Sequence, residues 1–158
     1  MDSGPNKNVL VDLRGSQINQ DRGIPAYAQS LVLQLCQDHP RHRYLFLREV
    51  GAALPGRAPE LSPHGEWRTE RDLASDAALH IDVLFTTSFY IDRQTHRRVK
   101  ARGTEYLYPH WLKRHSPRTL GVVYDLIPYL FPEKYLFRRG ALEAYSRALG
   151  FMREYDRL

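Results

Sequence analysis

The sequence is poor in the features that define several common classes of protein. It contains a single cysteine, Cys36, which excludes a disulfide framework and favours a reducing compartment. No stretch approaches the roughly 18 apolar residues that a membrane span needs, and the polar N-terminus lacks a signal-peptide core. The composition therefore predicts a soluble, cytoplasmic chain of 158 residues, enough for one domain.

Motifs for several kinds of catalysis are also missing. The histidines form no H-E-x-x-H motif, none pairs with the cysteine, and no D-x-D pair of aspartates occurs. The chain lacks the G-x-S-x-G elbow of serine hydrolases, the G-x-G-x-x-G dinucleotide fingerprint and the P-loop. We therefore expect a protein that uses neither a metal ion nor a bound cofactor.

Segments typical of strands alternate with segments typical of helices. Apolar runs rich in β-branched residues predict buried strands at residues 8–14, 43–48, 81–89 and 119–125. Apolar residues spaced by three and four predict helices at residues 24–38, 71–79 and 138–156. Prolines and glycines predict a loop across residues 51–65. Because parallel strands need crossover connections, the alternation predicts an α/β fold with a Rossmann-like, open, mainly parallel sheet and helices on both faces.

The chain is basic, with a formal net charge of +5, which favours anionic partners. Its most basic segment, residues 91–103, is either a solvated loop or a surface that contacts phosphates of a nucleic acid or an acidic membrane. The segment lacks interleaved aromatic residues and no nucleic-acid module is recognisable, so we do not expect nucleic acid as a partner. Its candidate contacts to anionic surfaces are Arg93, Arg97, Arg98, Lys100 and Arg102.

A glycine-containing loop follows the first predicted strand and leads into the first predicted helix. Gly23 stands directly before that helix, with Pro25 in its first turn. Unpaired N–H groups at the start of a helix can bind a phosphate, and glycine lets such a group approach closely. The alternative interpretation, that Gly23 belongs to an ordinary surface turn, is equally consistent with the sequence.

The predicted strand at 119–125 ends on a carboxylate, Asp125, which is followed by Pro128 and Pro132. Ligands of open α/β sheets bind beyond the carboxyl ends of the strands, so Asp125 is a candidate to face a hydroxylated ligand. An aspartate next to a turn also often caps the backbone of its own loop. Both interpretations stay open at this point.

The order of four motifs resembles the N-terminal half of retaining glycosyltransferases of family 4. These motifs are D-x-R at 12–14, G-I-x-x-Y-A at 23–28, V-V-Y-D-L-I-P-x-x-F-P-E-x-Y at 122–135 and R-x-Y-D-R-L at 153–158. The resemblance implies the GT-B architecture, in which two Rossmann-like domains face a cleft. Residues 1–158 would then form the N-terminal, acceptor-side domain, without the C-terminal domain that holds the nucleotide sugar. We expect such a chain to be inactive alone.

The resemblance also implies roles for individual residues. Asp125 would position the reacting groups beside the donor sugar, and Gly23 with Ile24 would approach the donor diphosphate. The donor is a nucleotide sugar held mainly by the absent domain, and the acceptor is a saccharide or a lipid-linked saccharide. The implied substrate-binding residues are Gly23, Ile24, Tyr124, Asp125, Pro128 and Glu133.

Two other functions compete with a plain cytoplasmic transferase. The chain could be a small α/β binding module that docks nucleic acid or acidic membranes through the segment from Arg93 to Arg102. Alternatively, the transferase could use that basic surface for peripheral contact with the inner face of the membrane, where lipid-linked acceptors lie.

Overall fold

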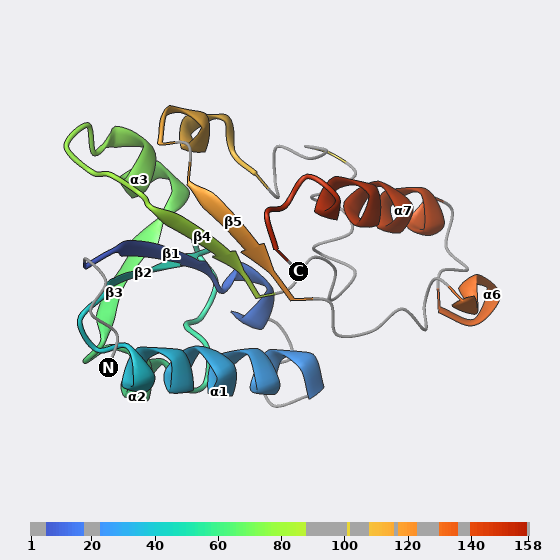
Figure 1. Ribbon diagram of the computed structural model, residues 1–158. Coiled ribbons are helices and arrows are strands. Elements are labelled where there is room, and N and C mark those ends of the chain that lie inside the picture. The colour runs from blue at the N-terminus through green and yellow to red at the C-terminus, as the bar shows by residue number, and fades with distance from the viewer. Residues whose placement is uncertain are drawn as a thin grey trace.

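A five-stranded sheet forms the centre of the computed structural model, which describes residues 6–17, 23–87, 101, 108–115, 117–122, 130–135 and 140–157 (Figure 1). All strand pairs are parallel and the order is β3-β2-β1-β4-β5. The strands are β1 (Asn8–Asp12), β2 (Arg43–Arg48), β3 (Gly65–Thr69), β4 (Val83–Thr86) and β5 (Arg118–Gly121). The helices are η1 (Arg14–Gln17), α1 (Gly23–Asp38), α2 (Ala58–Leu61), α3 (Glu70–Ser75), η3 (His110–Arg114), α6 (Pro132–Tyr135) and α7 (Ala141–Met152). The predicted Rossmann-like α/β fold is confirmed.

The handedness of parallel crossovers explains the layers of this fold. From β1 the chain moves outward to β2 and β3 through α1 and α2, and then returns past β1 to β4 through α3. A right-handed crossover places its helix on opposite faces for these two directions of travel. Accordingly, α1 and α2 lie on one face of the sheet and α3 lies on the other (Figure 1).

Two hydrophobic clusters, one on each face, fill the space between sheet and helices. Alternate residues of a strand point to opposite faces, so Val9 and Val11 join the α1 side while Leu10 joins the α3 side. Cys36 of α1 is fully buried in the first cluster, and burial raises its pKa to about 12. The thiol is therefore neutral and packs as a small apolar side chain, as the sequence indicated.

The predicted loop at 51–65 is wrong in part, because α2 lies inside it and β3 begins at its last residue. With four residues, α2 is too short to show a helical period. β3 is the outer strand of the sheet and carries charges that ordinary strand patterns lack. Among them, Glu66 forms ion pairs with Arg43 and Arg68.

Several predicted elements are shorter in the structure. β1 ends at Asp12, because the chain turns into η1 at Arg14, and β4 begins at Val83. α3 covers Glu70–Ser75 and starts at a capping box, in which Thr69 and Asp72 each bind the other's backbone N–H through their side chains. Among the described helices, none combines the length and the apolar character needed to cross a membrane.

Gly65 offers a direct test of how tightly β2 and β3 pack. A Cβ atom added there would lie 2.5 Å from the Tyr44 carbonyl oxygen and 2.8 Å from the Tyr44 Cβ. We expect Gly65→Ala to lower the free energy of unfolding by about 1–3 kcal/mol, measured by urea denaturation. The control is Gly150→Ala in α7, where a Cβ meets nothing within 4 Å, and where alanine should stabilise by about 0.5–1 kcal/mol. Equal effects of the two substitutions would contradict this packing.

Candidate functional site at the carboxyl edge of the sheet

The candidate site lies at the carboxyl ends of β1 and β4, where the strand order reverses. The chain leaves β1 toward β2 on one side, whereas β4 and β5 lie on the other side of β1. At this point the connecting helices diverge to opposite faces, and open α/β sheets bind their ligands at such a switch point. Asp12, the last residue of β1, lies in register with Leu47 on one side and Thr86 on the other.

A buried ion pair between Asp12 and Arg14 occupies the centre of this edge. Arg14 Nε donates to Asp12 Oδ1 at 2.9 Å and Nη2 donates to Oδ2 at 2.6 Å, so the contact is bidentate. The backbone N–H of Arg14 also donates to Asp12 Oδ1 at 3.1 Å. The Arg14 side chain is only 3% exposed, and its Nη1 lies 3.7 Å from Glu70 Oε2. The pair thus links the end of β1 to the start of α3.

Two threonines at the end of β4 connect it to β1 and to the segment after α7. Thr87 Oγ1 donates to the Asp12 carbonyl oxygen at 2.7 Å. Thr86 Oγ1 and the Tyr155 hydroxyl lie 2.8 Å apart and share a hydrogen bond. Burial raises the pKa of Tyr155, so this phenol stays protonated at neutral pH. The two hydrogen bonds therefore join the end of β1, the end of β4 and the segment after α7.

The start of α1 borders the same edge. Gly23 begins the helix with a φ of 35°, in the left-handed region that favours glycine, and a Cβ there would meet no atom within 4 Å. Gln17 of η1 fixes the neighbouring loop, since its Nε2 donates to Ala53 O at 2.8 Å and its Oε1 accepts from Glu49 N at 2.6 Å. No described side chain or backbone atom therefore fills the space beside Gly23, while the loop beside η1 is held firmly by Gln17.

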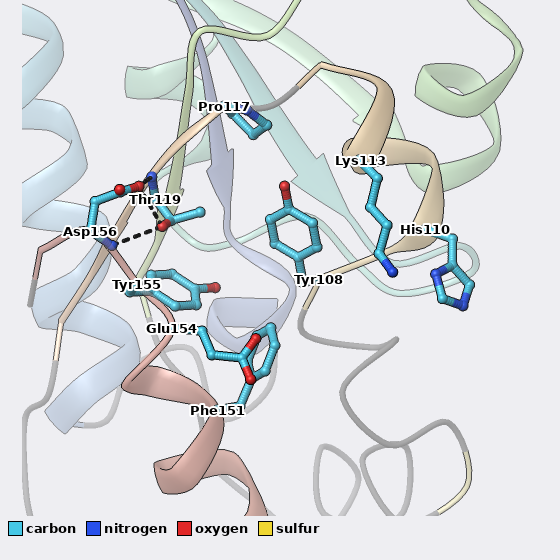
Figure 2. A pocket seen from close by; sticks show the side chains of 9 residues that line it. All are labelled: Tyr108, His110, Lys113, Pro117, Thr119, Phe151, Glu154, Tyr155 and Asp156. Atoms are coloured by element: carbon cyan, nitrogen blue, oxygen red, sulfur yellow. Dashed lines mark hydrogen bonds between the residues drawn. The ribbon is translucent and has the colours of Figure 1, made fainter.

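A separate cavity of about 380 Å³ lies between η3, the start of β5 and the end of α7 (Figure 2). Tyr108, Phe151 and Tyr155 line it, and successive ring centroids in this series are 6.4 Å and 5.9 Å apart. Asp156 also lines the cavity, but its Oδ2 accepts hydrogen bonds from the backbone N–H and the hydroxyl of Thr119. Tyr155 belongs to this aromatic wall and also forms the hydrogen bond with Thr86 at the carboxyl edge.

The structure describes only some of the binding residues that the sequence predicted. Gly23 and Ile24 form the start of α1, and Glu133 is exposed on α6, which lies beyond the carboxyl edge (Figure 1). The remaining nominated residues lie outside the described residues. They are Tyr124, Asp125, Pro128, Arg93, Arg97, Arg98, Lys100 and Arg102.

The site residues predicted from the sequence do not include the side chains that form the hydrogen bonds of the described edge. Asp12 and Arg14 enter the sequence-based prediction only as part of a motif, although a D-x-R at the end of a buried strand indicates a local carboxylate–guanidinium pair. Consecutive threonines at the end of an apolar run, Thr86 and Thr87, also signal hydroxyls at the carboxyl edge. For Tyr155 no local signal exists, because its partner is 69 residues away.

The described residues contain no group of three side chains suited to hold a metal ion. Fold and edge together define a Rossmann-like α/β domain whose switch point lies between β1 and β4. In comparisons with known proteins, the chain matches no protein-family model, no curated protein and no solved structure.

The Asp12–Arg14 pair can be tested by a double-mutant cycle. Asp12→Asn should lower the free energy of unfolding by about 3–5 kcal/mol, because it leaves the Arg14 guanidinium buried without its carboxylate. The double variant Asp12→Asn/Arg14→Met removes both charges and should cost about 1–3 kcal/mol less than the sum of the single variants. Urea denaturation measures all four proteins. Strict additivity would contradict a direct interaction.

The contact between Asp156 and Thr119 predicts a pH dependence. Hydrogen bonds from Thr119 lower the pKa of Asp156, so this contact stabilises the fold at neutral pH and is lost as the pH falls through the lowered pKa. We expect Asp156→Asn to be less stable than the wild type at pH 7, and the difference to shrink below about pH 4. Thermal unfolding across pH measures it. A difference that persists unchanged into strong acid would show that the carboxylate charge is irrelevant.

Proposed function

We propose that this chain is the N-terminal, acceptor-side domain of a retaining, nucleotide-sugar-dependent glycosyltransferase with GT-B architecture. The observation that supports it most is the convergence of two distant motifs. D-x-R at 12–14 and R-x-Y-D-R-L at 153–158 are far apart in sequence, yet both meet the carboxyl end of β4. Thr87 binds the backbone of Asp12, while Thr86 binds Tyr155.

The parallel sheet gives further support. Its strand order places the switch point between β1 and β4, and the described residues leave space beside Gly23 at the start of α1. A nucleotide sugar bound by a second domain would present its diphosphate to this edge, where N–H groups at the start of α1 would bind it. The acceptor would occupy the crevice on this domain's side, so that both substrates meet above the ends of the strands.

In this proposal the domain contributes position and not covalent chemistry. The transferred sugar keeps its anomeric configuration because the acceptor attacks from the face that the diphosphate leaves, and the departing phosphate takes the acceptor proton. Asp125 orients the sugar in that step. The main catalytic terms are the alignment of the two substrates and the electrostatic stabilisation of the departing diphosphate. Such an enzyme would act in the cytoplasm on a saccharide or lipid-linked acceptor.

The test uses the full-length protein that the proposal implies, incubated with a panel of nucleotide sugars while released nucleoside diphosphate is measured. We expect Asp125→Ala to lower kcat/KM by about 100-fold, since misplacement of a reacting group by about 1 Å can cost that much. The matched control is Asp38→Ala, which removes an exposed carboxylate at the end of α1 and should leave the rate unchanged. If no nucleotide sugar is consumed, or if both variants turn over like the wild type, the proposal fails.

A further inference from the structure

A hollow at the carboxyl ends of β2 and β3, here called the arginine pocket, shares Arg14 and Glu70 with the site described above but also has two arginines that the site does not use. It has a volume of about 360 Å³ and lies at the end of β2 and the start of α3. The residues that matter for its chemistry are Arg14, Arg48, Glu49, Glu70 and Arg71. Three guanidinium groups thus face two carboxylates around one opening.

The sheet register brings these arginines together. Arg48 is the last residue of β2 and pairs with Thr69, the last residue of β3. Arg71 follows Thr69 by two residues, in the first turn of α3. Their backbone positions are therefore set by the β2–β3 pairing and by the capping box that starts α3, which also places Glu70 beside Arg14.

Arg48 and Arg71 differ from Arg14 in their partners. Arg14 is tied to Asp12 and approaches Glu70. Within the described part of the chain, neither Arg48 nor Arg71 forms an ion pair or a side-chain hydrogen bond. Asp72 lies within electrostatic range of Arg48, but its Oδ2 accepts hydrogen bonds from the backbone N–H and the hydroxyl of Thr69. Two guanidinium groups at this pocket are therefore available to an external anion.

We propose that the arginine pocket binds a compact oxyanion, a phosphate or carboxylate group carried by a small molecule, with Arg48 and Arg71 as its binding residues. Guanidinium groups bind both anions through paired N–H donors. The volume leaves room for a sugar-sized body attached to that group. If the chain is the acceptor-side domain proposed above, the oxyanion belongs to the acceptor. That assignment rests on the proposed function, whereas the binding does not.

Calorimetric titration of the chain tests the site with three probes of similar size: glucose 6-phosphate, glucuronate and glucose. The variants are Arg48→Gln, Arg71→Gln and the double variant. The matched control is Arg41→Gln, which removes the same charge from an exposed turn before β2, at the opposite end of that strand. Thermal unfolding of each variant verifies that it folds, and direct binding needs no turnover, so failure here is distinct from failure of the transferase proposal.

We expect one or both anionic probes to bind, glucose not to bind, and affinity to fall as salt rises. The preference between phosphate and carboxylate identifies the source of the oxyanion. The double variant should bind at least about tenfold more weakly, because each arginine supplies charge-assisted hydrogen bonds, while Arg41→Gln binds like the wild type. No binding of either anion, equal binding of glucose, or an equal loss in Arg41→Gln would overturn the proposal.

Discussion

The pairing of Asp12 with Arg14 is the constraint on which the carboxyl edge depends. Asp12 ends the middle strand of the sheet, and its carboxylate accepts hydrogen bonds from both the side chain and the backbone of Arg14. A buried carboxylate without such donors would be costly, and so would a buried guanidinium without an acceptor. Each residue therefore offsets the free-energy cost of burying the other. Together they fix where β1 stops and where η1 begins, and Arg14 reaches Glu70 at the start of α3.

In this arrangement, the groups that fix the strand ends differ from the groups that are left to bind a ligand. In the described edge, the side chains of Asp12, Thr86 and Thr87 bind Arg14, Tyr155 and the Asp12 backbone, so they hold the strand ends in place. The open places lie beside Gly23 and at Arg48 and Arg71, around this fixed centre. Binding groups carried by a rigid scaffold lose less conformational entropy when a ligand arrives.

Most strands and helices could be predicted from the sequence because apolar runs and apolar periodicity are local features. The buried run of β2 and the apolar stripe of α1 predict those elements at nearly their observed bounds. β3 and α2 escaped prediction because an edge strand with Glu66 and Arg68 shows no apolar run, and a single helical turn shows no period. Of the nominated site residues, the structure describes Gly23, Ile24 and Glu133, whereas Asp125 stays a prediction. The groups that converge on Thr86 could not be read from local patterns.

The hydrogen bond between Thr86 and Tyr155 also has a consequence for folding during translation. The two residues are 69 positions apart, so the hydroxyl at the end of β4 has to wait for its partner while the ribosome adds the intervening chain. The β1–β2 pairing, α1 and α3 depend on residues made early, but the outer edge of β4 pairs only after β5 has been made, and Thr86 only after α7. The nascent chain therefore carries an unpaired strand edge at β4 until β5 is made, and such an edge is where another strand can add.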